Sequence, residues 1–203
     1  QREVGIDTHS YEEALKNALR EAPDVIMIGE IRDRNTMKQA IAYAETGHLC
    51  LSTLHANNAN QAMERVINFF PEEAHRQLLV DLSLNLADVV SQRLIPGLHQ
   101  KLVPAVEVML NSSYISDLIA KGEFSGIKEA MARSTEIGMC TFDQALYQLY
   151  TENRISLDEA LHNADSRTDL ALRVRLAAGV STQDAGDLSI DTSSPIQSAA
   201  RLA

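Results

Sequence analysis

The chain has 203 residues, of which 45% are hydrophobic, and its formal net charge at pH 7 is −10. This length suits one folded domain, or one and a half, with a substantial apolar core. The negative charge argues against a nucleic acid as a general partner of the surface. No apolar run reaches the roughly 20 residues that span a bilayer and no signal peptide opens the chain, so we expect an intracellular protein.

The chain opens on Gln1 rather than on methionine and enters patterned sequence at once, so we expect it to continue a longer protein. Its two cysteines, Cys50 and Cys140, form no Cys-x-x-Cys pair. We therefore expect two free thiols in a reducing compartment, and neither a disulfide framework nor a structural zinc site.

Helical and strand patterns alternate over the first part of the chain. Helices are expected at residues 10–21, 35–45 and 59–70, and strands at residues 25–28 and 49–54. The connections are short, which predicts an α/β fold with a parallel sheet. The unbroken apolar run from Val25 to Ile28 is typical of a parallel strand that is buried on both faces. Asn35 is expected to cap the second helix, and Gly47 to end it.

The rest of the sequence predicts a long helix at residues 72–94, a strand at residues 102–110 and then helices only. These last helices are expected at residues 113–121, 125–134, 141–152, 156–165 and 168–177. Thr141 and Ser156 are suitable N-caps for two of them. Residues 179–203 contain few large apolar side chains, which predicts a disordered tail.

The segment Asp24-Val-Ile-Met-Ile-Gly-Glu-Ile-Arg-Asp33 ends an apolar run in Gly29 and Glu30, with Arg32 and Asp33 just beyond. Ligands of open α/β sheets bind at the carboxyl ends of the strands. A carboxylate there can hold Mg²⁺ through water, or orient an attacking water beside a nucleotide phosphate. Gly29 would let the backbone approach such a ligand closely. For an isolated pattern, however, a solvated acid in a strand-to-helix loop is the commoner outcome.

A second polar group follows the next predicted strand. If the two strands are neighbours, Thr53 and His55 emerge at the same sheet edge as Glu30. A hydroxyl and an imidazole beside an acid provide donors whose positions can change when a γ-phosphate leaves. His48, taken alone, is more simply a capping or core histidine. A metal site made of His48, Cys50 and His55 is disfavoured because position 55 is out of phase with the other two and no further ligand lies nearby.

Together these segments resemble the secretion-ATPase superfamily, whose members power type IV pili and type II secretion. The resemblance covers residues 1–178 in order and spacing, and its motifs lie at residues 1–5, 18–24, 29–33, 44–48 and 52–56. It implies that Asp24–Asp33 is the Walker B element and that Gly47–His55 is the segment called the His box. The implied architecture is the C-terminal part of a RecA-like ATPase core over residues 1–111, a small all-helical C-terminal subdomain over residues 112–178, and the tail.

The resemblance also implies ATP and Mg²⁺ as cofactors. Glu30 and His55 would then be catalytic, with Glu30 supporting Mg²⁺ through water. Support of the nucleotide, its phosphates or the subunit boundary would come from Gly29, Arg32, Asp33, His48 and Thr53.

One absence separates the branches of this superfamily. Pilus-extension and type II secretion relatives usually insert a four-cysteine zinc loop after a Gln-Arg-Leu segment, whereas here residues 91–96 lead to residues 101–104 without a cysteine. This favours the retraction branch. The variant sequences at residues 54–60 and 68–71 are more similar to the accessory (PilU-like) than to the principal (PilT-like) retraction motors.

Residues 114–121 resemble a helical motif of the retraction motors. Ile115, Leu118 and Ile119 are kept, whereas Ser116 and Ala120 stand where arginines are expected. The spacing of the three apolar residues also suits any amphipathic helix, so core packing is at least as good an interpretation.

The function that the resemblance implies is a hexameric motor ATPase that drives type IV pilus retraction and twitching motility at the cytoplasmic face of the inner membrane. Its expected partners are further copies of itself, the paralogous principal retraction ATPase and the inner-membrane pilus platform protein, but no nucleic acid. A non-catalytic adaptor subunit is an alternative, motivated by Ser116 and Ala120. A related secretion or DNA-transfer ATPase is another, disfavoured by the missing zinc loop.

No phosphate-binding loop of the form Gly-x-x-x-x-Gly-Lys-Ser/Thr occurs in the 203 residues. Without its backbone N–H groups and lysine, nothing in the chain would hold the β- and γ-phosphates. The family's Asp box and arginine fingers are also expected upstream of these residues. We therefore expect this polypeptide by itself not to hydrolyse ATP.

Overall fold

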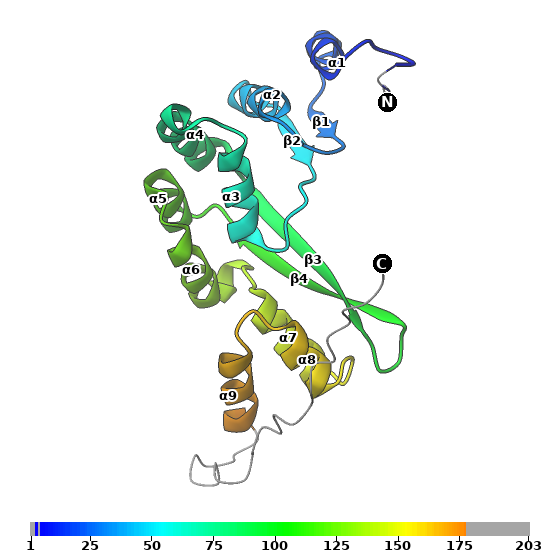
Figure 1. Cartoon of the computed structure of the whole chain (residues 1–203), viewed down its shortest axis with the longest axis vertical. Coiled ribbons are helices and arrows are strands. Elements are labelled where there is room, and N and C mark those ends of the chain that lie inside the picture. Colours follow the sequence, from blue (N-terminus) through cyan, green and yellow to red (C-terminus); the bar gives the residue numbers. More distant parts are fainter. Residues whose placement is uncertain (1–2, 4, 178–203) are drawn as a thin grey trace, which may run out of the picture.

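The computed structural model describes residue 3 and residues 5–177 (Figure 1). The tail predicted at residues 179–203 lies outside the described residues. The first part of the described chain alternates helices and strands, as predicted. Its elements are α1 (Tyr11–Ala18), a 3-10 turn (Leu19–Glu21), β1 (Val25–Ile28), α2 (Arg34–Glu45), β2 (Leu49–Ser52), α3 (Ala59–Asn68) and α4 (Glu72–Asn85).

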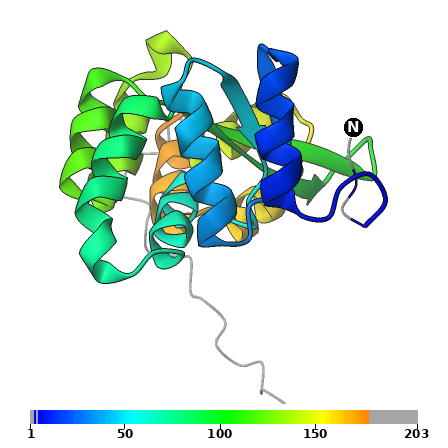
Figure 2. The same cartoon turned by 90° about the horizontal axis from the view of Figure 1, so that it is seen from above.

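Strands β1 and β2 form a parallel pair, with Val25 opposite Leu49 and Ile28 opposite Ser52. This pair confirms the predicted α/β class. Helices α1, α2 and α4 follow one another as neighbours in a curved layer that α5 (Ser113–Lys121) continues (Figures 1 and 2).

The prediction that the first strands are buried on both faces is wrong for the described residues. Ile26 and Ile28 are buried, but Val25 and Met27 are 50% and 75% exposed. Leu49 and Leu51 of β2 are about half exposed as well. The helices of the described chain pack against one face of this small sheet and leave the other face open.

The long helix predicted at residues 72–94 is wrong beyond Asn85. Residues Asp88–Pro96 instead form β3, which pairs antiparallel with β4 (Leu102–Leu110) in a long hairpin (Figure 1). Asn111 lies against the last turn of α4. The side-chain N–H groups of Asn111 donate to the carbonyls of Ser83 and Leu86 at 2.9 and 2.7 Å. The carbonyls at the helix end are thus satisfied by a residue distant in sequence.

The predicted helices of the last part are all present. After α5 come α6 (Ile127–Arg133), α7 (Phe142–Thr151), α8 (Leu157–Asn163) and α9 (Arg167–Ala177), with short 3-10 turns at Phe124–Gly126 and Thr135–Ile137. The predicted N-caps are confirmed. Thr141 forms a capping box with Gln144, and the Ser156 hydroxyl accepts the N–H of Glu159 at 3.1 Å.

Two apolar clusters hold these elements together. The first joins β1 and α2 to α3, α4, α5 and α6, and the second joins the outer part of the β3–β4 hairpin to α7, α8 and α9. Ile115 lies in the first cluster and Phe142 in the second, and both are fully buried. The domain boundary at residue 112 stays a prediction.

Replacing Ile115 by alanine should lower the free energy of unfolding by about 3 kcal/mol, because it leaves a cavity in the first apolar cluster. Ile115 is 0% exposed, whereas its neighbour Tyr114 is 61% exposed and serves as the matched control. Tyr114→Ala should change the same free energy by no more than about 0.5 kcal/mol. Denaturant titrations of the two variants measure both values, and equal losses would contradict the packing described here.

Candidate functional site

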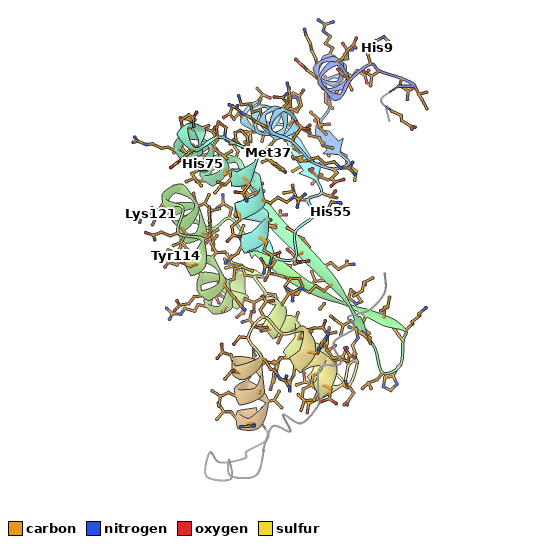
Figure 3. All side chains as sticks on the ribbon, in the orientation of Figure 1. His9, Met37, His55, His75, Tyr114 and Lys121 are labelled. Carbon is orange, nitrogen blue, oxygen red and sulfur yellow. The ribbon has the colours of Figure 1, made fainter. Side chains whose placement is uncertain are left out.

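The parallel pairing of β1 and β2 brings Glu30 and His55 together just beyond the carboxyl ends of the two strands. The Nε2 atom of His55 lies 3.0 Å from Oε1 of Glu30. The backbone continues the pairing past the strands, since the N–H of Ile31 donates to the carbonyl of Thr53 at 3.0 Å. Figure 3 shows His55 on the segment between β2 and α3. The acid and the imidazole thus share one edge of the sheet, as the sequence predicted.

Glu30 is an ionised acid, and each of its two carboxylate oxygens contacts one basic side chain. The Nε of Arg32 donates to Oε2 of Glu30 at 2.6 Å, while Oε1 faces His55. The pKa of Glu30 is lowered, mainly by the hydrogen bond from Arg32 and against a smaller opposing effect of desolvation. Glu30 therefore carries a negative charge at neutral pH, at the place where ligands of parallel sheets bind.

Thr53 and Gly29 join the two strand ends to each other. The Thr53 hydroxyl donates to the Gly29 carbonyl at 2.5 Å. A Cβ atom added at Gly29 would meet no heavy atom of the described residues within 4 Å. The space beside Gly29 is therefore open, and the role of Gly29 and Thr53 beside a ligand stays a prediction.

Asp33 caps α2, a role that we expected from the sequence for Asn35. Its carboxylate accepts the backbone N–H and the hydroxyl of Thr36, both at 2.9 Å, and so caps α2. The prediction that Asn35 caps this helix is wrong, because the helix begins one residue earlier, at Arg34. The hydrogen bond from the Thr36 backbone lowers the pKa of Asp33.

His48 lies at the other end of the sheet. It precedes β2, five positions before Thr53, which is about 16 Å along an extended strand. Its Nδ1 atom lies 3.0 Å from the Thr46 hydroxyl and 3.3 Å from the Tyr43 carbonyl, and its ring meets the Tyr43 ring edge-on. These contacts fit a histidine that stabilises the end of α2. Its role at a subunit boundary stays a prediction.

The three apolar residues of the predicted motor motif are packed in the core. Ile115, Leu118 and Ile119 are all buried in the first apolar cluster. The Ser116 hydroxyl donates to the Ser83 carbonyl of α4 at 2.7 Å. Figure 3 shows Tyr114 on the outer side of α5, well away from His55. Core packing is thus confirmed, and a motor role for the three residues stays a prediction.

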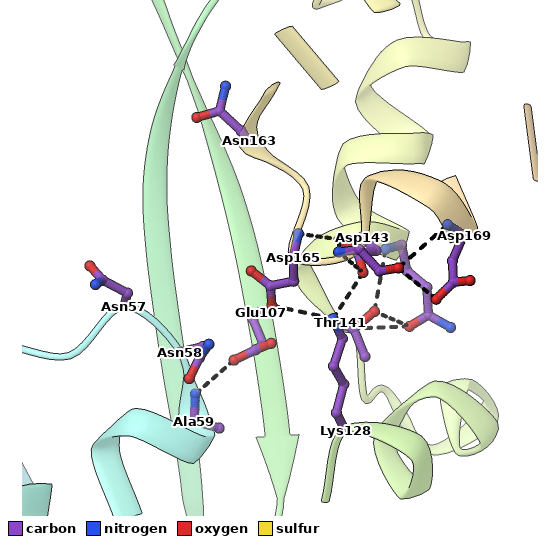
Figure 4. Close-up of polar contacts among 12 residues, drawn as sticks. Asn57, Asn58, Ala59, Glu107, Lys128, Thr141, Asp143, Asn163, Asp165 and Asp169 are labelled. Atoms are coloured by element: carbon purple, nitrogen blue, oxygen red, sulfur yellow. Dashed lines mark hydrogen bonds and ion pairs between the residues drawn. The ribbon is translucent and has the colours of Figure 1, made fainter. Parts of the chain in front are cut away.

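Two polar residues of the β3–β4 hairpin were missed from the sequence. Glu107 is only 3% exposed, and its Oε1 accepts the backbone N–H of Ala59 at 2.8 Å (Figure 4). Burial raises the pKa of Glu107, and the hydrogen bond from Ala59 opposes that change. Arg93 donates to the Asn57 carbonyl, two residues beyond His55. The available signals were an acid within an apolar strand and the arginine of the Ser-Gln-Arg-Leu segment.

The chemistry of Glu30 suits indirect support of a cation better than direct ligation. Its carboxylate is ionised, but Arg32 and His55 already contact its two oxygens. Mg²⁺ keeps several waters in most nucleotide sites, and a carboxylate can hold it through one of them. Among the described residues, no group of three or more His, Cys, Asp or Glu side chains is arranged to hold a metal ion. Nor does any described helix have the length and apolar character of a membrane span.

Comparison with known proteins shows the family. The sequence profile of the Type II/IV secretion system proteins matches residues 5–178. The chain belongs to this family. The type IV pilus ATPase PilU of Pseudomonas aeruginosa is 60% identical over 190 residues, which are 93% of this chain and 49% of PilU. The retraction ATPase PilT of the same organism is 38% identical over 164 residues, 81% of this chain and 48% of PilT.

The fold of this chain is also similar to that of a solved relative. The crystal structure of the pilus retraction motor PilT with bound ADP superimposes with a TM-score of 0.75 at 37% identity, over 85% of this chain and 48% of that one. The predicted RecA-like class and the PilU-like resemblance are thus confirmed. The chain spans about half the length of the curated relatives that it matches.

In this chain, Asp33→Ala should lower the free energy of unfolding by about 1 kcal/mol because α2 loses its cap, whereas Asp33→Asn should cost much less. The folded-state pKa of Asp33 lies below its ordinary value of 3.8, so the stability that it adds is present above that value. This stability is lost as the pH falls through the folded-state pKa, and Asp33→Asn should not show that loss. Urea titrations at neutral and acid pH measure both effects, and an equal cost of the two substitutions would exclude capping.

Proposed function

We propose that in the intact protein this chain is part of a hexameric motor ATPase that drives type IV pilus retraction and twitching motility. The observation that carries the proposal is the 3.0 Å contact between Glu30 and His55 at the carboxyl ends of two parallel strands. The relatives support it, since PilU is named as a type IV pilus ATPase and PilT as a pilus retraction motor with bound ADP.

The electrostatics of Glu30 favour one role over another. A carboxylate whose pKa is held low is a weak proton acceptor, so Glu30 suits the orientation of an attacking water, or of a water on Mg²⁺, better than proton abstraction. Mg²⁺ bound with ATP would neutralise charge on the phosphates. His55, which is exposed beside Glu30, would contact a phosphate oxygen and lose that contact after hydrolysis. Gly29, Arg32 and Thr53 would support the same edge.

Replacing Glu30 by glutamine in the intact protein should lower kcat for ATP hydrolysis by about 100-fold or more, because the charge that orients water is lost. Nucleotide affinity should change little. The exposed Glu64 of α3 offers a control with the same chemical change, and Glu64→Gln should keep normal turnover. Steady-state kinetics and a nucleotide titration test the two variants together. Unchanged turnover in Glu30→Gln would rule out the proposed role.

The 203-residue polypeptide by itself should bind ATP with a dissociation constant weaker than about 1 mM and should not hydrolyse it, because it contains no phosphate-binding loop. Calorimetric titration with MgATP checks the affinity, and a phosphate-release assay checks hydrolysis. A Mg²⁺-dependent affinity in the micromolar range would contradict this expectation, since the described site would then hold the phosphates unaided.

The proposed assembly is a ring of six copies, with the paralogous principal retraction ATPase and the inner-membrane pilus platform protein as further partners. It would work in the cytoplasm, at the inner face of that membrane. The net charge of −10 gives no support to a nucleic acid partner.

One observation favours a second candidate function, a non-catalytic adaptor of the retraction motor. Ser116 stands where the retraction motors are expected to carry an arginine, and its hydroxyl is used in a contact to the Ser83 carbonyl inside the molecule. Ala120 replaces the second expected arginine. The sequence upstream of Gln1 discriminates between the two functions, because an intact phosphate-binding loop supports the motor and an eroded loop supports the adaptor. A secretion or DNA-transfer ATPase has no such observation in its favour.

A further inference from the structure

The position of His55 is set by its backbone rather than by packing around its ring. The side chain is 76% exposed, and within the described residues its ring makes a polar contact with Glu30. A single polar contact at the surface is a weak restraint on an imidazole that is otherwise exposed. The geometry of the pair therefore depends on what holds the segment Leu54–Asn58, called here the His55 loop.

Each end of the His55 loop is tied down by a different part of the molecule. At the first end, the Thr53 carbonyl and hydroxyl are bonded to Ile31 and Gly29 beyond β1. At the second end, two nitrogens of Arg93, Nε and a terminal nitrogen, donate to the Asn57 carbonyl at 3.4 and 3.3 Å. The first tie belongs to the sheet, and the second belongs to the β3–β4 hairpin.

Arg93 is itself held firmly by the helices that follow the hairpin. Its guanidinium lies over the Phe142 ring, 3.9 Å from the ring centroid. It donates to the Asn163 carbonyl at 3.0 Å and pairs with the Asp165 carboxylate at 2.7 Å. Its side chain is 23% exposed, so most of its surface is covered by the rest of the molecule. A planar guanidinium with five N–H donors can make all of these contacts at once, which an ammonium group cannot.

Asp165, which accepts a hydrogen bond from Arg93, is itself held by further contacts (Figure 4). Its backbone N–H donates to Asp143 at 2.7 Å, and Lys128 contacts both carboxylates, at 2.9 Å for Asp143 and 3.4 Å for Asp165. Beside Arg93, the buried Glu107 bonds the N–H of Ala59, the first residue of α3. The second end of the His55 loop thus rests on a partly buried polar network that spans α3, the hairpin, α6, α7 and the turn before α9.

We propose that Arg93 is a positioning residue of the nucleotide site, which holds the His55 loop so that His55 stays against Glu30 and links the loop to the C-terminal helices. The inference rests on the proposed function and adds to it a residue that touches neither Glu30 nor His55. A movement of α8, or of the turn that contains Asp165, would be transmitted to the Asn57 carbonyl through the Arg93 side chain. Conversely, a change at His55 would reach the same segments through Arg93.

The test compares Arg93→Met and Arg93→Lys with Arg133→Met in the intact protein. Arg133 is a suitable control because its side chain is 78% exposed and pairs with Glu129 one helical turn away on the same helix. Hydrogen exchange followed by mass spectrometry reports on residues 54–59, and steady-state kinetics reports on ATP turnover. In both Arg93 variants, the amides of residues 54–59 should exchange faster than in the wild type, and the rest of the chain should exchange at its wild-type rate. Both substitutions should lower kcat about tenfold or more with less than about a threefold change in KM, because a misplaced group affects the reaction more than binding.

Arg93→Lys guards against a variant that simply fails to fold. It keeps a positive charge beside Asp165, so the melting temperature should stay near normal. The faster exchange of the His55 loop and the lower kcat should remain, because lysine lacks the planar guanidinium that reaches all of these acceptors. Wild-type exchange and kcat in Arg93→Lys would overturn the inference. So would exchange that rises uniformly over the whole chain in both variants, since Arg93 would then be merely structural.

The two proposals can fail separately. If the intact wild-type protein has no ATPase activity, the proposed function fails. The positioning role of Arg93 is then tested by hydrogen exchange at residues 54–59 alone. If turnover is normal in all variants and the loop exchanges at its wild-type rate, the inference fails while the motor function stands.

Discussion

Beyond the last paired residues of β1 and β2, the Ile31 N–H still donates to the Thr53 carbonyl and the Thr53 hydroxyl to the Gly29 carbonyl. These bonds join the two segments beyond the strands, where the candidate site lies. The acid and the imidazole are thus brought together by main-chain pairing, and their own contact only completes an arrangement that the backbone has already set.

Much of the fold could be predicted from the sequence because its signals are local. The helices of the C-terminal part begin at hydroxyl side chains such as Thr141 and Ser156, and alternation of helix and strand indicated the parallel pair. Strand β3 was missed because the residue that satisfies the carbonyls at the end of α4 is Asn111, more than twenty residues away. The alternation of β3 was also obscured, since Ser91 is buried within it. Such long-range satisfaction of a helix end leaves no mark in a local window.

The candidate site was predicted in the same uneven way. Glu30, Thr53 and His55 follow strands whose patterns are clear, so their meeting at one sheet edge could be foreseen. Asp33 was assigned to that edge as well; its carboxylate caps α2 through Thr36, and its role beside a ligand stays a prediction. Arg93 was passed over because its partners, the Asn57 and Asn163 carbonyls and Asp165, are contributed by segments far apart in the chain. The His55 ring is mostly exposed, whereas Arg93 behind its loop makes contacts to several segments of the chain.

The small sheet has a consequence for handling the chain by itself. Within the described residues, β1 and β2 have only each other as partners, so the outer edge of each strand presents unpaired N–H and carbonyl groups. The same strands expose Val25, Met27, Leu49 and Leu51 on one face. An open edge beside an apolar face is a template on which another copy can add a strand. We therefore expect the isolated chain to self-associate as its concentration rises. Added salt will not prevent this association, because backbone pairing and apolar contact, rather than charge, hold the copies together.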